Sequence, residues 1–373
     1  MTQKTSRAAL DSEILEWMRE TPWQHDETRF DSLALRLFAH QFEACVPYAR
    51  YCRSQGSVPG EVASWRDIPA VPTGAFKEVR LAGFDPASTC KIFRTSGTSS
   101  ARCGELHLDT LALYETSLEA SLRRFVFPDL EGGERMTSRV LAPSAQEAPD
   151  SSLSHMFDRA LEIFGDESSG HDLEDTKLCV ENFLAAVLRS CHANRPLAIC
   201  GTAFAFVHLL DEIEERGSAG LELPTGSRVL ETGGFKGRSR SVSRPDLHAM
   251  IGERFGLPGS HVLNQYGMTE LGSQFYDGPL QEEGAPPGKP TPPWTRVRLI
   301  DPGSGDDVGP DRTGMIVIHD LANTGSVAAI QTADLGRFTA GSVDERFEIL
   351  GREPGAEERG CSIAADSMLE TGT

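Results

Sequence analysis

The sequence predicts an α/β protein in which a parallel sheet flanked by helices is joined to a small β-rich unit. Three short runs predict strands: residues 197–202 are largely apolar, residues 228–234 and 261–266 contain apolar pairs, and each run has a glycine at or directly after its end. Such runs are typical of strands buried on both faces of a parallel sheet. Helical patterns at residues 173–194 and 203–216 alternate with the runs, which favours a sheet with a site at the carboxyl ends of its strands.

The N-terminal region is predicted to form a helical layer. Residues 8–20 and 28–53 carry apolar side chains at helical spacing, with Arg or Glu between them. Two prolines within residues 68–72 then force extended backbone, and Lys77 follows at a turn. Lys77 is either a cation that faces a carboxylate or phosphate, or a solvated surface lysine.

The remaining elements are predicted from the same periodicities. The sequence predicts a helix, a strand and the start of a second helix at residues 108–124, 139–143 and 149–156. Residues 295–300 and 314–319 alternate polar and apolar side chains, as strands of a β-rich unit do, and a short strand is expected at 346–350.

Composition narrows the class of protein. The chain has 373 residues, 39% hydrophobic and 24% charged, which is normal for a globular protein. Its formal net charge of −19 argues against binding to nucleic acid or to an anionic membrane surface. The longest apolar stretch, residues 197–210, is too short for a membrane span, and the N-terminus lacks an apolar signal core. We therefore expect a cytoplasmic protein.

The cysteines give no sign of a zinc site. The eight cysteines include no Cys-x-x-Cys pair, and Cys191 is directly followed by a histidine instead of standing at zinc-ligand spacing. Free buried thiols are the expectation for most of them.

The run NQYGMTE at residues 264–270 combines groups that suit a nucleotide. The ring of Tyr266 can stack on a base, and the following glycine lets backbone approach a ligand. Thr269 can bond a phosphate oxygen, and Glu270 can hold Mg²⁺, which prefers oxygen ligands. The same residues also make an ordinary strand-to-turn sequence.

A second run, TSGTSS at residues 95–100, places hydroxyl groups around Gly97. Hydroxyl and N–H groups of such a loop can surround a polyphosphate, although Ser, Thr and Gly are also common in plain turns. The run lacks the Gly-x-x-x-x-Gly-Lys spacing of a P-loop, so that motif is rejected.

The order of motifs along the chain carries a family resemblance. Residues 95–100 are followed by polar or glycine-bearing segments at 232–234, 266–270, 332–337 and 350–352. This succession resembles the adenylate-forming superfamily of acyl and aryl acid ligases. Within it, residues 71–77, 233–238 and 359–362 are most similar to the acyl-protein synthetases of the LuxE type, and the resemblance covers roughly residues 60 to 370.

The resemblance implies an adenylate-forming-enzyme-like fold, ATP and Mg²⁺ as cofactors, and a role for each matched residue. Phosphate contacts would come from Thr95, Ser96, Gly97 and Thr98, with Thr269 on the α-phosphate. Adenine would lie against Gly233, Gly234 and Tyr266, and Glu270 would bind the metal. Asp334 would accept from ribose, Arg352 would lie near ribose or phosphate, and His155 would line the acid pocket. Asp334 can equally be a cap or turn residue, and His155 can be structural.

The resemblance also implies an acyl acceptor, in the segment after Arg352. Typical superfamily members carry a further domain with a catalytic lysine there, but residues 353–373 contain no lysine. The resemblance therefore implies a truncated C-terminal domain and an acyl group carried on Cys361, a thiol being a strong nucleophile toward an acyl adenylate. Cys361 can also be an incidental tail cysteine. We expect a helical region at 1–90, an adenylation core at 91–345 and a short C-terminal segment at 346–373.

Three functions are compatible with these residues. In the first, a carboxylic acid, by resemblance a fatty acid, reacts with ATP to give acyl-AMP and then a thioester on Cys361 for delivery to an acyl reductase or another acyl-accepting protein. In the second, the acyl group passes to CoA, a carrier protein or an amine. In the third, the chain only binds a nucleotide and docks a partner. The sequence leaves aliphatic, aromatic and long-chain acids open.

Overall fold

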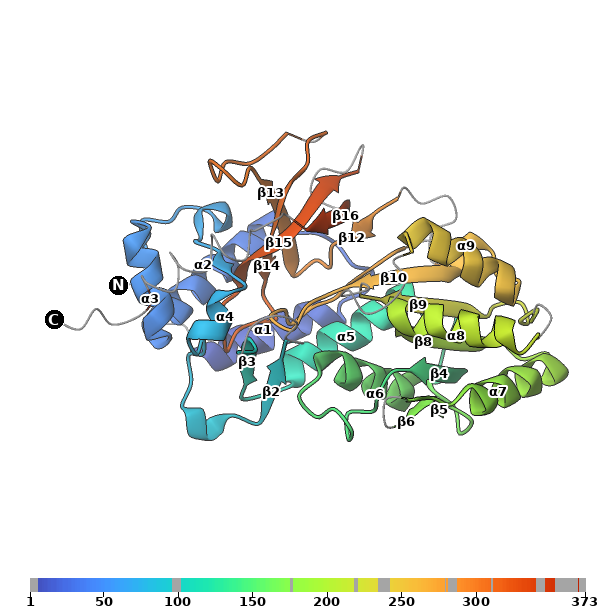
Figure 1. Ribbon diagram of the computed structural model, residues 1–373. Helices are drawn as coiled ribbons and strands as arrows, with labels where there is room; N and C mark the ends of the chain where they lie inside the picture. The colour runs from blue at the N-terminus through green and yellow to red at the C-terminus, as the bar shows by residue number, and fades with distance from the viewer. Residues whose placement is uncertain are drawn as a thin grey trace. The chain divides into compact units, whose positions relative to one another are not determined.

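The computed structural model describes residues 6–95, 102–174, 177–217, 221–233, 242–278, 280, 287–309, 311–339, 346–352 and 368. They fall into two compact units (Figure 1). Unit 1 comprises Met1–Ala120, Met268–Phe275 and Pro286–Thr373, and unit 2 comprises Ser121–Gly267 and Tyr276–Ala285. The predicted boundaries at 90/91 and 345/346 stay a prediction.

Unit 2 is built on a parallel sheet. Its strand order is β11-β10-β9-β8-β4-β5, with parallel pairing from β10 through to β5. The strands are β4 (Thr137–Leu141), β5 (Gly170–His171), β8 (Leu197–Thr202), β9 (Arg228–Thr232), β10 (Val262–Tyr266) and β11 (Phe275–Tyr276). The central strands β8, β9 and β10 are almost wholly buried, polar positions included, so both faces of the sheet are covered there.

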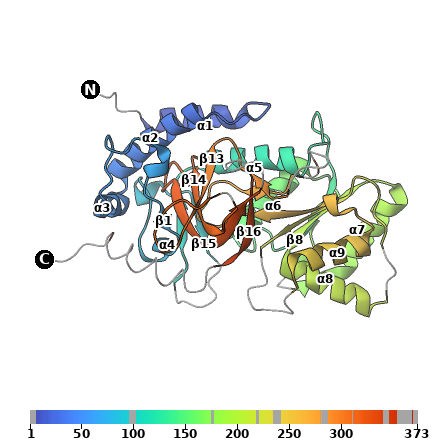
Figure 2. The ribbon, with the colours of Figure 1, turned by 90° about the horizontal axis from the view of Figure 1, so that it is seen from above.

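Three helices supply the core on one face of this sheet. They are α7 (Val180–Ala193), α8 (Ala203–Glu215) and α9 (Arg244–Phe255), and their apolar side chains form one cluster with β8, β9 and β10. Helix α8 begins where the Thr202 hydroxyl accepts from the N–H of Ala205 (3.1 Å). Figures 1 and 2 show α8 and α9 side by side. Helix α6 (Ser152–Phe164) contacts β4.

Unit 1 contains an antiparallel sheet in the order β12-β16-β15-β14-β13. The strands are β12 (Lys289–Pro290), β13 (Thr295–Ile300), β14 (Gly314–Asp320), β15 (Ala329–Phe338) and β16 (Arg346–Arg352). Strand β1 (Val71–Pro72) pairs with the first part of β15 in parallel, Val71 opposite Ile330. The chain is therefore extended at this point, as the prolines predicted.

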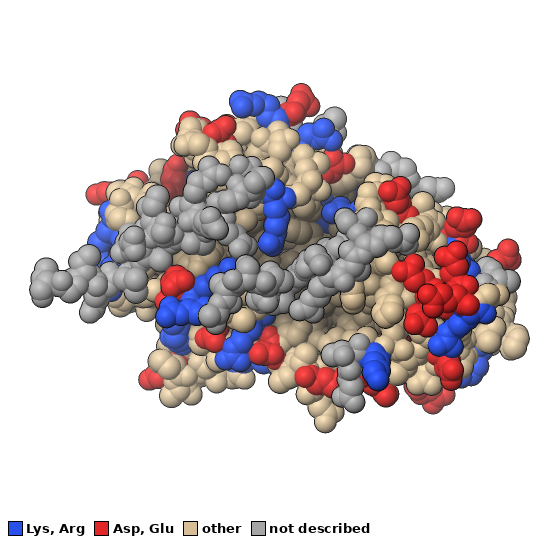
Figure 3. All heavy atoms as spheres, viewed as in Figure 1, with Lys and Arg blue, Asp and Glu red and all other residues tan. Residues whose placement is uncertain are grey.

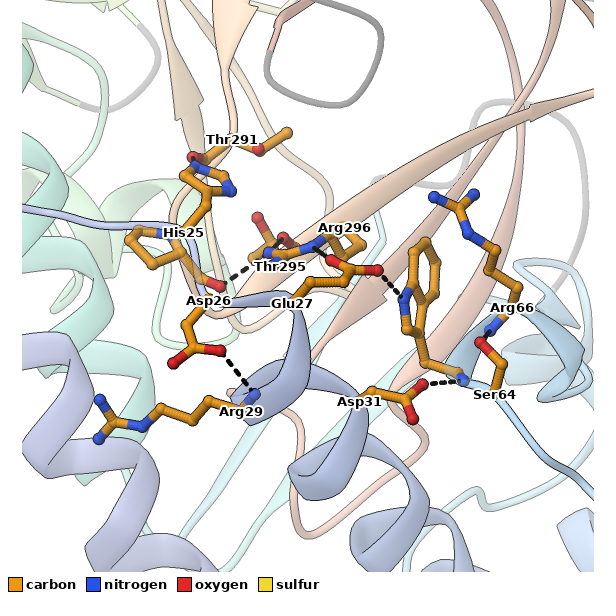
Figure 4. Close-up of polar contacts among 12 residues, drawn as sticks. His25, Asp26, Glu27, Arg29, Asp31, Ser64, Arg66, Thr291, Thr295 and Arg296 are labelled. Atoms are coloured by element: carbon orange, nitrogen blue, oxygen red, sulfur yellow. Dashed lines mark hydrogen bonds and ion pairs between the residues drawn. The ribbon is translucent and has the colours of Figure 1, made fainter.

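The N-terminal helices α1 (Arg7–Arg19), α2 (Glu27–Ala44) and α3 (Val46–Ser54) also belong to unit 1. Figure 4 shows how Glu27, at the start of α2, joins two distant segments. Its carboxylate accepts from Trp65 Nε1 (2.7 Å) and from Nε of Arg296 on β13 (2.9 Å). Burial opposes ionisation, but these hydrogen bonds outweigh it and lower the pKa of Glu27. The charged pair thus fixes α2 to the sheet.

A hairpin and a short helix complete the described part of unit 1. Strand β2 (Lys91–Arg94) pairs antiparallel with β3 (Glu105–Leu108), and α4 (Ala75–Glu78) contacts β3. Helix α5 (Ala112–Phe125) follows β3.

The structure confirms the predicted α/β class and corrects three boundaries. The periodicity at residues 28–53 is two helices, because the chain breaks at Cys45 and a proline occupies the first turn of α3. The helix predicted at 173–194 begins only at Val180, after the short strands β6 (Leu173–Glu174) and β7 (Lys177–Leu178). The helix predicted from residue 108 begins at Ala112. Within the described part of the chain, no helix combines the length and apolarity needed to cross a bilayer.

Candidate active site

The predicted site residues divide between the units, and five lie outside the described residues. The latter are Ser96, Gly97, Thr98, Gly234 and Cys361. Unit 1 contains Lys77, Thr95, Thr269, Glu270, Asp334 and Arg352, while unit 2 contains His155, Gly233 and Tyr266.

Thr95 closes the base of the β2–β3 hairpin. Its N–H donates to the carbonyl of Gly104, and its hydroxyl oxygen accepts from the N–H of Gly104, both at 2.9 Å. Since a threonine hydroxyl can donate as well as accept, its hydrogen stays available for a phosphate oxygen. Thr95 is thus held to Gly104 by one backbone hydrogen bond and by one from the Gly104 N–H to the Thr95 hydroxyl.

Thr269 is brought to the same hairpin from 175 positions away. Its Oγ1 lies 3.4 Å from the carbonyl oxygen of Arg94, which directly precedes Thr95. This distance is long for an O–H···O hydrogen bond, so the hydroxyl is weakly held and can turn to a better acceptor. Two motifs that the sequence placed far apart therefore meet at one point of unit 1.

Glu270 follows as a buried carboxylate with 5% exposure. The segment is fixed through its backbone, because the carbonyl of Glu270 accepts from Asn323 Nδ2 (2.7 Å). Among the described residues, no group of three or more His, Cys, Asp or Glu side chains is arranged to hold a metal ion. A single carboxylate suits the mode in which Mg²⁺ keeps waters and takes its remaining oxygens from substrate phosphates.

Asp334 and Arg352 face each other across neighbouring strands. They are paired in the β15–β16 register, and Arg352 Nε lies 3.1 Å from Asp334 Oδ1. The Thr332 hydroxyl accepts from the N–H of Asp334 (3.1 Å), so the carboxylate is held at its base. The Asp334 side chain is 12% exposed and that of Arg352 71%, so this pair presents an acceptor and a cation at the sheet edge.

Lys77 is connected to the same sheet through the backbone. It lies on α4, a few residues after β1, and the N–H of Thr73 donates to the carbonyl of Gln331 on β15 (3.0 Å). Its side chain is half-buried, so Lys77 is not a fully solvated surface lysine.

In unit 2, Gly233 and Tyr266 lie at the ends of adjacent parallel strands. Thr232 and Gln265 are register partners near the ends of β9 and β10, and their side chains hydrogen-bond. Gly233 has φ of +79°, a left-handed conformation that favours glycine. Gly233 and Tyr266 therefore lie at the carboxyl edge of the sheet, where sites of parallel sheets occur.

His155 occupies the first turn of α6. Its N–H donates to the carbonyl of Ser151 (3.1 Å), and the Ser151 hydroxyl caps the helix by accepting from the N–H of Ser154 (3.1 Å). The side chain is partly exposed. Both the pocket role and the structural role of His155 stay open.

Comparison with known proteins decides the family. The family described as "Acyl-protein synthetase, LuxE" matches residues 168–370, more than half of the chain. The chain belongs to the acyl-protein synthetase family. Membership makes it a ligase, and the resemblance and enzyme class predicted from the ordered motifs are confirmed.

Curated relatives agree with this assignment. The long-chain-fatty-acid–luciferin-component ligase of Aliivibrio fischeri is 21% identical over 363 residues, 93% of this chain and 91% of that protein. The ligase of the same name from Vibrio harveyi is 20% identical over 329 residues, 85% of this chain and 82% of that protein.

Solved structures confirm the fold of this acyl-protein synthetase family member. A 2-hydroxyisobutyryl-CoA ligase, open and in complex with 2-HIB-AMP and CoA, has a TM-score of 0.62 at 13% identity and covers 90% of this chain and 80% of that one. The same ligase in the postadenylation state with 2-HIB-AMP has a TM-score of 0.64 at 14% identity, covering 88% and 69%. The predicted adenylate-forming-enzyme-like fold is therefore confirmed.

The sequence interpretation missed a buried cluster beside the strand ends of unit 2. Glu231 on β9 has 1% exposure, accepts from Asn264 Nδ2 (2.7 Å), and has His248 Nε2 at 3.3 Å. The cluster ties β9 to β10 and α9, directly before Gly233 and Tyr266. A glutamate inside a segment predicted to be a buried strand was the available signal, because a buried carboxylate needs partners.

Proposed function

We propose that the chain activates a carboxylic acid with ATP to give acyl-AMP and then forms an acyl thioester. The observation that carries the proposal is the approach of Thr269 to the β2–β3 hairpin. It brings the hydroxyl that would contact the α-phosphate to the base of the run that would contact the other phosphates (3.4 Å between Thr269 Oγ1 and the Arg94 carbonyl).

Formation of acyl-AMP would require a distinct role from each of the site residues. The substrate carboxylate attacks the α-phosphorus of ATP, the new C–O–P linkage forms, and the bond to pyrophosphate breaks. Hydroxyls of Thr95 and Thr269 would orient the phosphates and stabilise charge that develops at phosphorus. Asp334 would accept from the ribose hydroxyls, oriented by Arg352, while Gly233 and Tyr266 would contact adenine.

We propose Glu270 as the ligand of Mg²⁺. The metal would supply positive charge that lets two anions approach each other. The position of Glu270, directly after the threonine that would contact the α-phosphate, supports this role. Removing the metal with a chelator should abolish activity, and Mg²⁺ should restore it.

The proposed substrate class is the fatty acid. Both curated relatives are named as ligases of long-chain fatty acids, and they align with most of this chain. The proposed acceptor is the thiolate of Cys361, which would attack the acyl carbon of acyl-AMP and release AMP. The thioester would then pass to an acyl-accepting protein such as a reductase.

Acid-dependent exchange of labelled pyrophosphate into ATP tests the activation step. We expect exchange with a medium- or long-chain fatty acid from a panel that also holds aromatic and short-chain acids. Thr269→Val removes the proposed α-phosphate contact and should lower exchange by about tenfold or more. Thr110→Val, just before α5, is the matched control. An absence of exchange with every acid would leave only the nucleotide-binding alternative.

Labelling with radioactive acid and ATP tests the acceptor. The wild-type chain should retain the label after denaturation and lose it to hydroxylamine, as a thioester does. Cys361→Ser should abolish thioester labelling but keep pyrophosphate exchange, whereas Cys191→Ser should change neither. If Cys361→Ser keeps a full hydroxylamine-sensitive label, the acyl group goes elsewhere, and product formation with CoA, a carrier protein or an amine identifies the alternative.

A further inference from the structure

A pocket in unit 1 includes residues of α4 and of the β2–β3 hairpin in its lining, and apart from Lys77 this lining was not part of the predicted site. Its volume is about 440 Å³. The pocket is lined by α4 and the segment after it, and by the β2–β3 hairpin: Phe76, Lys77, Glu78, Val79, Arg80, Arg94, Arg102, Cys103, Glu105 and His107. Arg94 directly precedes Thr95 and Arg102 follows residue 101, so two of the lining residues flank the hydroxyl-rich run in the sequence.

The lining is rich in positive charge. Four cationic side chains face two carboxylates, although the whole chain carries a net charge of −19. Figure 3 shows basic side chains gathered over α4 and the β2–β3 hairpin, with acidic ones among them. Among the ion pairs of the described lining, Arg94 with Glu105 (2.9 Å) and Arg102 with Glu78 (3.2 Å) involve exposed groups and are therefore weak. Local charge of this kind attracts an anion despite the net charge of the molecule.

Arg80 supplies charge that no carboxylate of the described residues balances. Its Nη1 donates to the carbonyl of Phe84 (3.0 Å), and its guanidinium lies 4.8 Å from the centre of the Phe84 ring. Its Nε and Nη2 are buried and have no hydrogen-bond partner among the described residues. A buried guanidinium whose N–H groups lack acceptors is stabilised when an anion binds next to it.

The positive charge of Arg80 also acts on His107, another lining residue of the pocket. Burial and then the charge of Arg80 lower the pKa of His107, against the opposing effect of Glu105. The imidazole is therefore neutral at pH 7 and adds a hydrogen-bonding group without repelling an anion by charge. An anion bound in the pocket would offset the charge of Arg80 and raise the pKa of His107 again.

We propose that this pocket binds a terminal phosphate group, with Arg80, Arg94 and Arg102 as the binding residues. Planar guanidinium groups match phosphate oxygens through two parallel N–H···O bonds, which suits them to this ligand. Two sources of the group are considered: one arises from the proposed function, on which its assignment rests, and the other from the alternative in which CoA or a carrier protein accepts the acyl group. One is the pyrophosphate that leaves ATP, and the other is the phosphate of a phosphopantetheine thiol that accepts the acyl group.

Calorimetric titration of the full chain, without acid or ATP, tests the pocket directly. The probes are inorganic pyrophosphate and pantetheine 4′-phosphate. We expect the double variant Arg94→Gln/Arg102→Gln to bind at least one probe about tenfold or more weakly than wild type. Both side chains are well exposed (43% and 72%), so their replacement leaves the core intact. The control is Arg195→Gln, whose side chain is 66% exposed in a loose 3.7 Å pair with Asp166.

Each outcome separates the possibilities. Loss of pyrophosphate binding alone identifies the leaving group, loss of pantetheine phosphate binding alone identifies the acceptor, and loss of both shows a site for any terminal phosphate. A rise in the pKa of His107 on saturation, followed by NMR, places the anion in this pocket. Unchanged binding of both probes in the double variant, or no binding by wild type, overturns the pocket. Because pyrophosphate exchange is measured separately, either result can occur whether or not the proposed function holds.

Discussion

At the scale of single residues, a buried carboxylate of unit 1 is expected to make the folding stability depend on pH. Asp320, at the end of β14, is fully buried. Its Oδ1 accepts from the Ser273 hydroxyl (2.8 Å) and from the N–H of Ala322 (3.0 Å), while its Oδ2 has no partner among the described residues. Burial raises the pKa of Asp320 to about 6, although these hydrogen bonds oppose the rise.

The raised pKa predicts a stability that falls as pH rises. The folded chain holds the proton of Asp320 up to about pH 6, whereas the unfolded chain releases it near pH 4. Folding stability should therefore decline between about pH 4 and 6 by roughly 2–3 kcal/mol from this group. In Asp320→Asn that decline should be absent, because the amide does not titrate.

Urea unfolding at pH 4 and pH 8 measures this difference, because these two values bracket the expected decline. Wild type should lose more stability than Asp320→Asn between the two pH values. Neighbouring His319, whose pKa burial lowers to about 3, is common to both chains, so its effect cancels in the comparison. Asp307→Asn, at a half-exposed carboxylate paired with Arg298, is the control and should follow wild type. Parallel pH profiles for wild type and Asp320→Asn would show that Asp320 is ionised in the folded chain.

At the scale of elements, strands are fixed by close backbone approach and by buried charge pairs. The β15 motif at residues 332–337 supplied part of the family resemblance, and its glycine proves to be a packing residue. A Cβ on Gly336 would lie 2.8 Å from the carbonyl oxygen of Glu348 and 2.9 Å from Cδ1 of Ile316. The strands β14 and β16 thus leave no space for a side chain there.

Gly336→Ala should therefore destabilise unit 1. We expect a loss of about 1–3 kcal/mol, since backbone on one side cannot move aside for the added methyl group. Thermal or urea unfolding measures the loss. The control is Gly309→Ala, where an added Cβ meets nothing within 4 Å and φ is not in the left-handed region. Equal stability of the two variants would contradict the close packing of β15.

A buried arginine fixes the start of β9 in unit 2. Arg228 has 2% exposure, and its Nη1 and Nη2 donate to the two carboxylate oxygens of Asp129 at 2.6 and 2.7 Å. Burial opposes ionisation of Asp129, but the bonds from Arg228 prevail and lower its pKa. Removing one member of such a pair leaves an uncompensated buried charge.

Asp129→Ala should accordingly cost about 3 kcal/mol of unfolding free energy. Glu348→Ala, which breaks the half-exposed pair with Arg337 (2.9 Å), should cost less than about 1 kcal/mol. Denaturant unfolding of both variants gives the comparison. Similar costs for the two would mean that the carbonyls of Val126 and Gly226, which also accept from Arg228, suffice without the carboxylate.

At the scale of the whole molecule, ligand binding should appear as added stability. A nucleotide that binds only the folded chain stabilises it by an amount set by its concentration relative to the dissociation constant. With Mg²⁺ and ATP at about 100 times that constant, the expected gain is about 2.7 kcal/mol, or a rise of several degrees in the melting temperature. Differential scanning fluorimetry measures it.

Variants distinguish specific from general stabilisation in this experiment. Asp334→Asn should reduce the shift caused by ATP while leaving the melting temperature of the free chain within about 1–2 °C of wild type. Asp306→Asn, at an exposed loop position, should retain the full shift. A shift of equal size in all three chains would argue against Asp334 as a ribose acceptor.

Sequence alone determined the parts of this protein that depend on local pattern and motif order. Short segments with apolar side chains and a terminal glycine predicted β8, β9 and β10, and the ordered motifs predicted the family. The prediction from periodicity was wrong at two helix boundaries. A proline in the first turn of α3 separates that helix from α2, and the short β6–β7 hairpin precedes the start of α7. The roles of Ser96, Gly97, Thr98, Gly234 and Cys361 stay predictions of the sequence.

Only the tertiary structure decided which distant residues meet. Thr269 reaches Arg94 across 175 positions, and Asp334 faces Arg352 because β15 and β16 pair in one register. The basic pocket could not be predicted from the sequence, because Arg80 lies outside every motif and charged residues are common on surfaces. Periodicity records which face of an element is buried, but the pairing of elements sets distances between side chains, and chemistry depends on those distances.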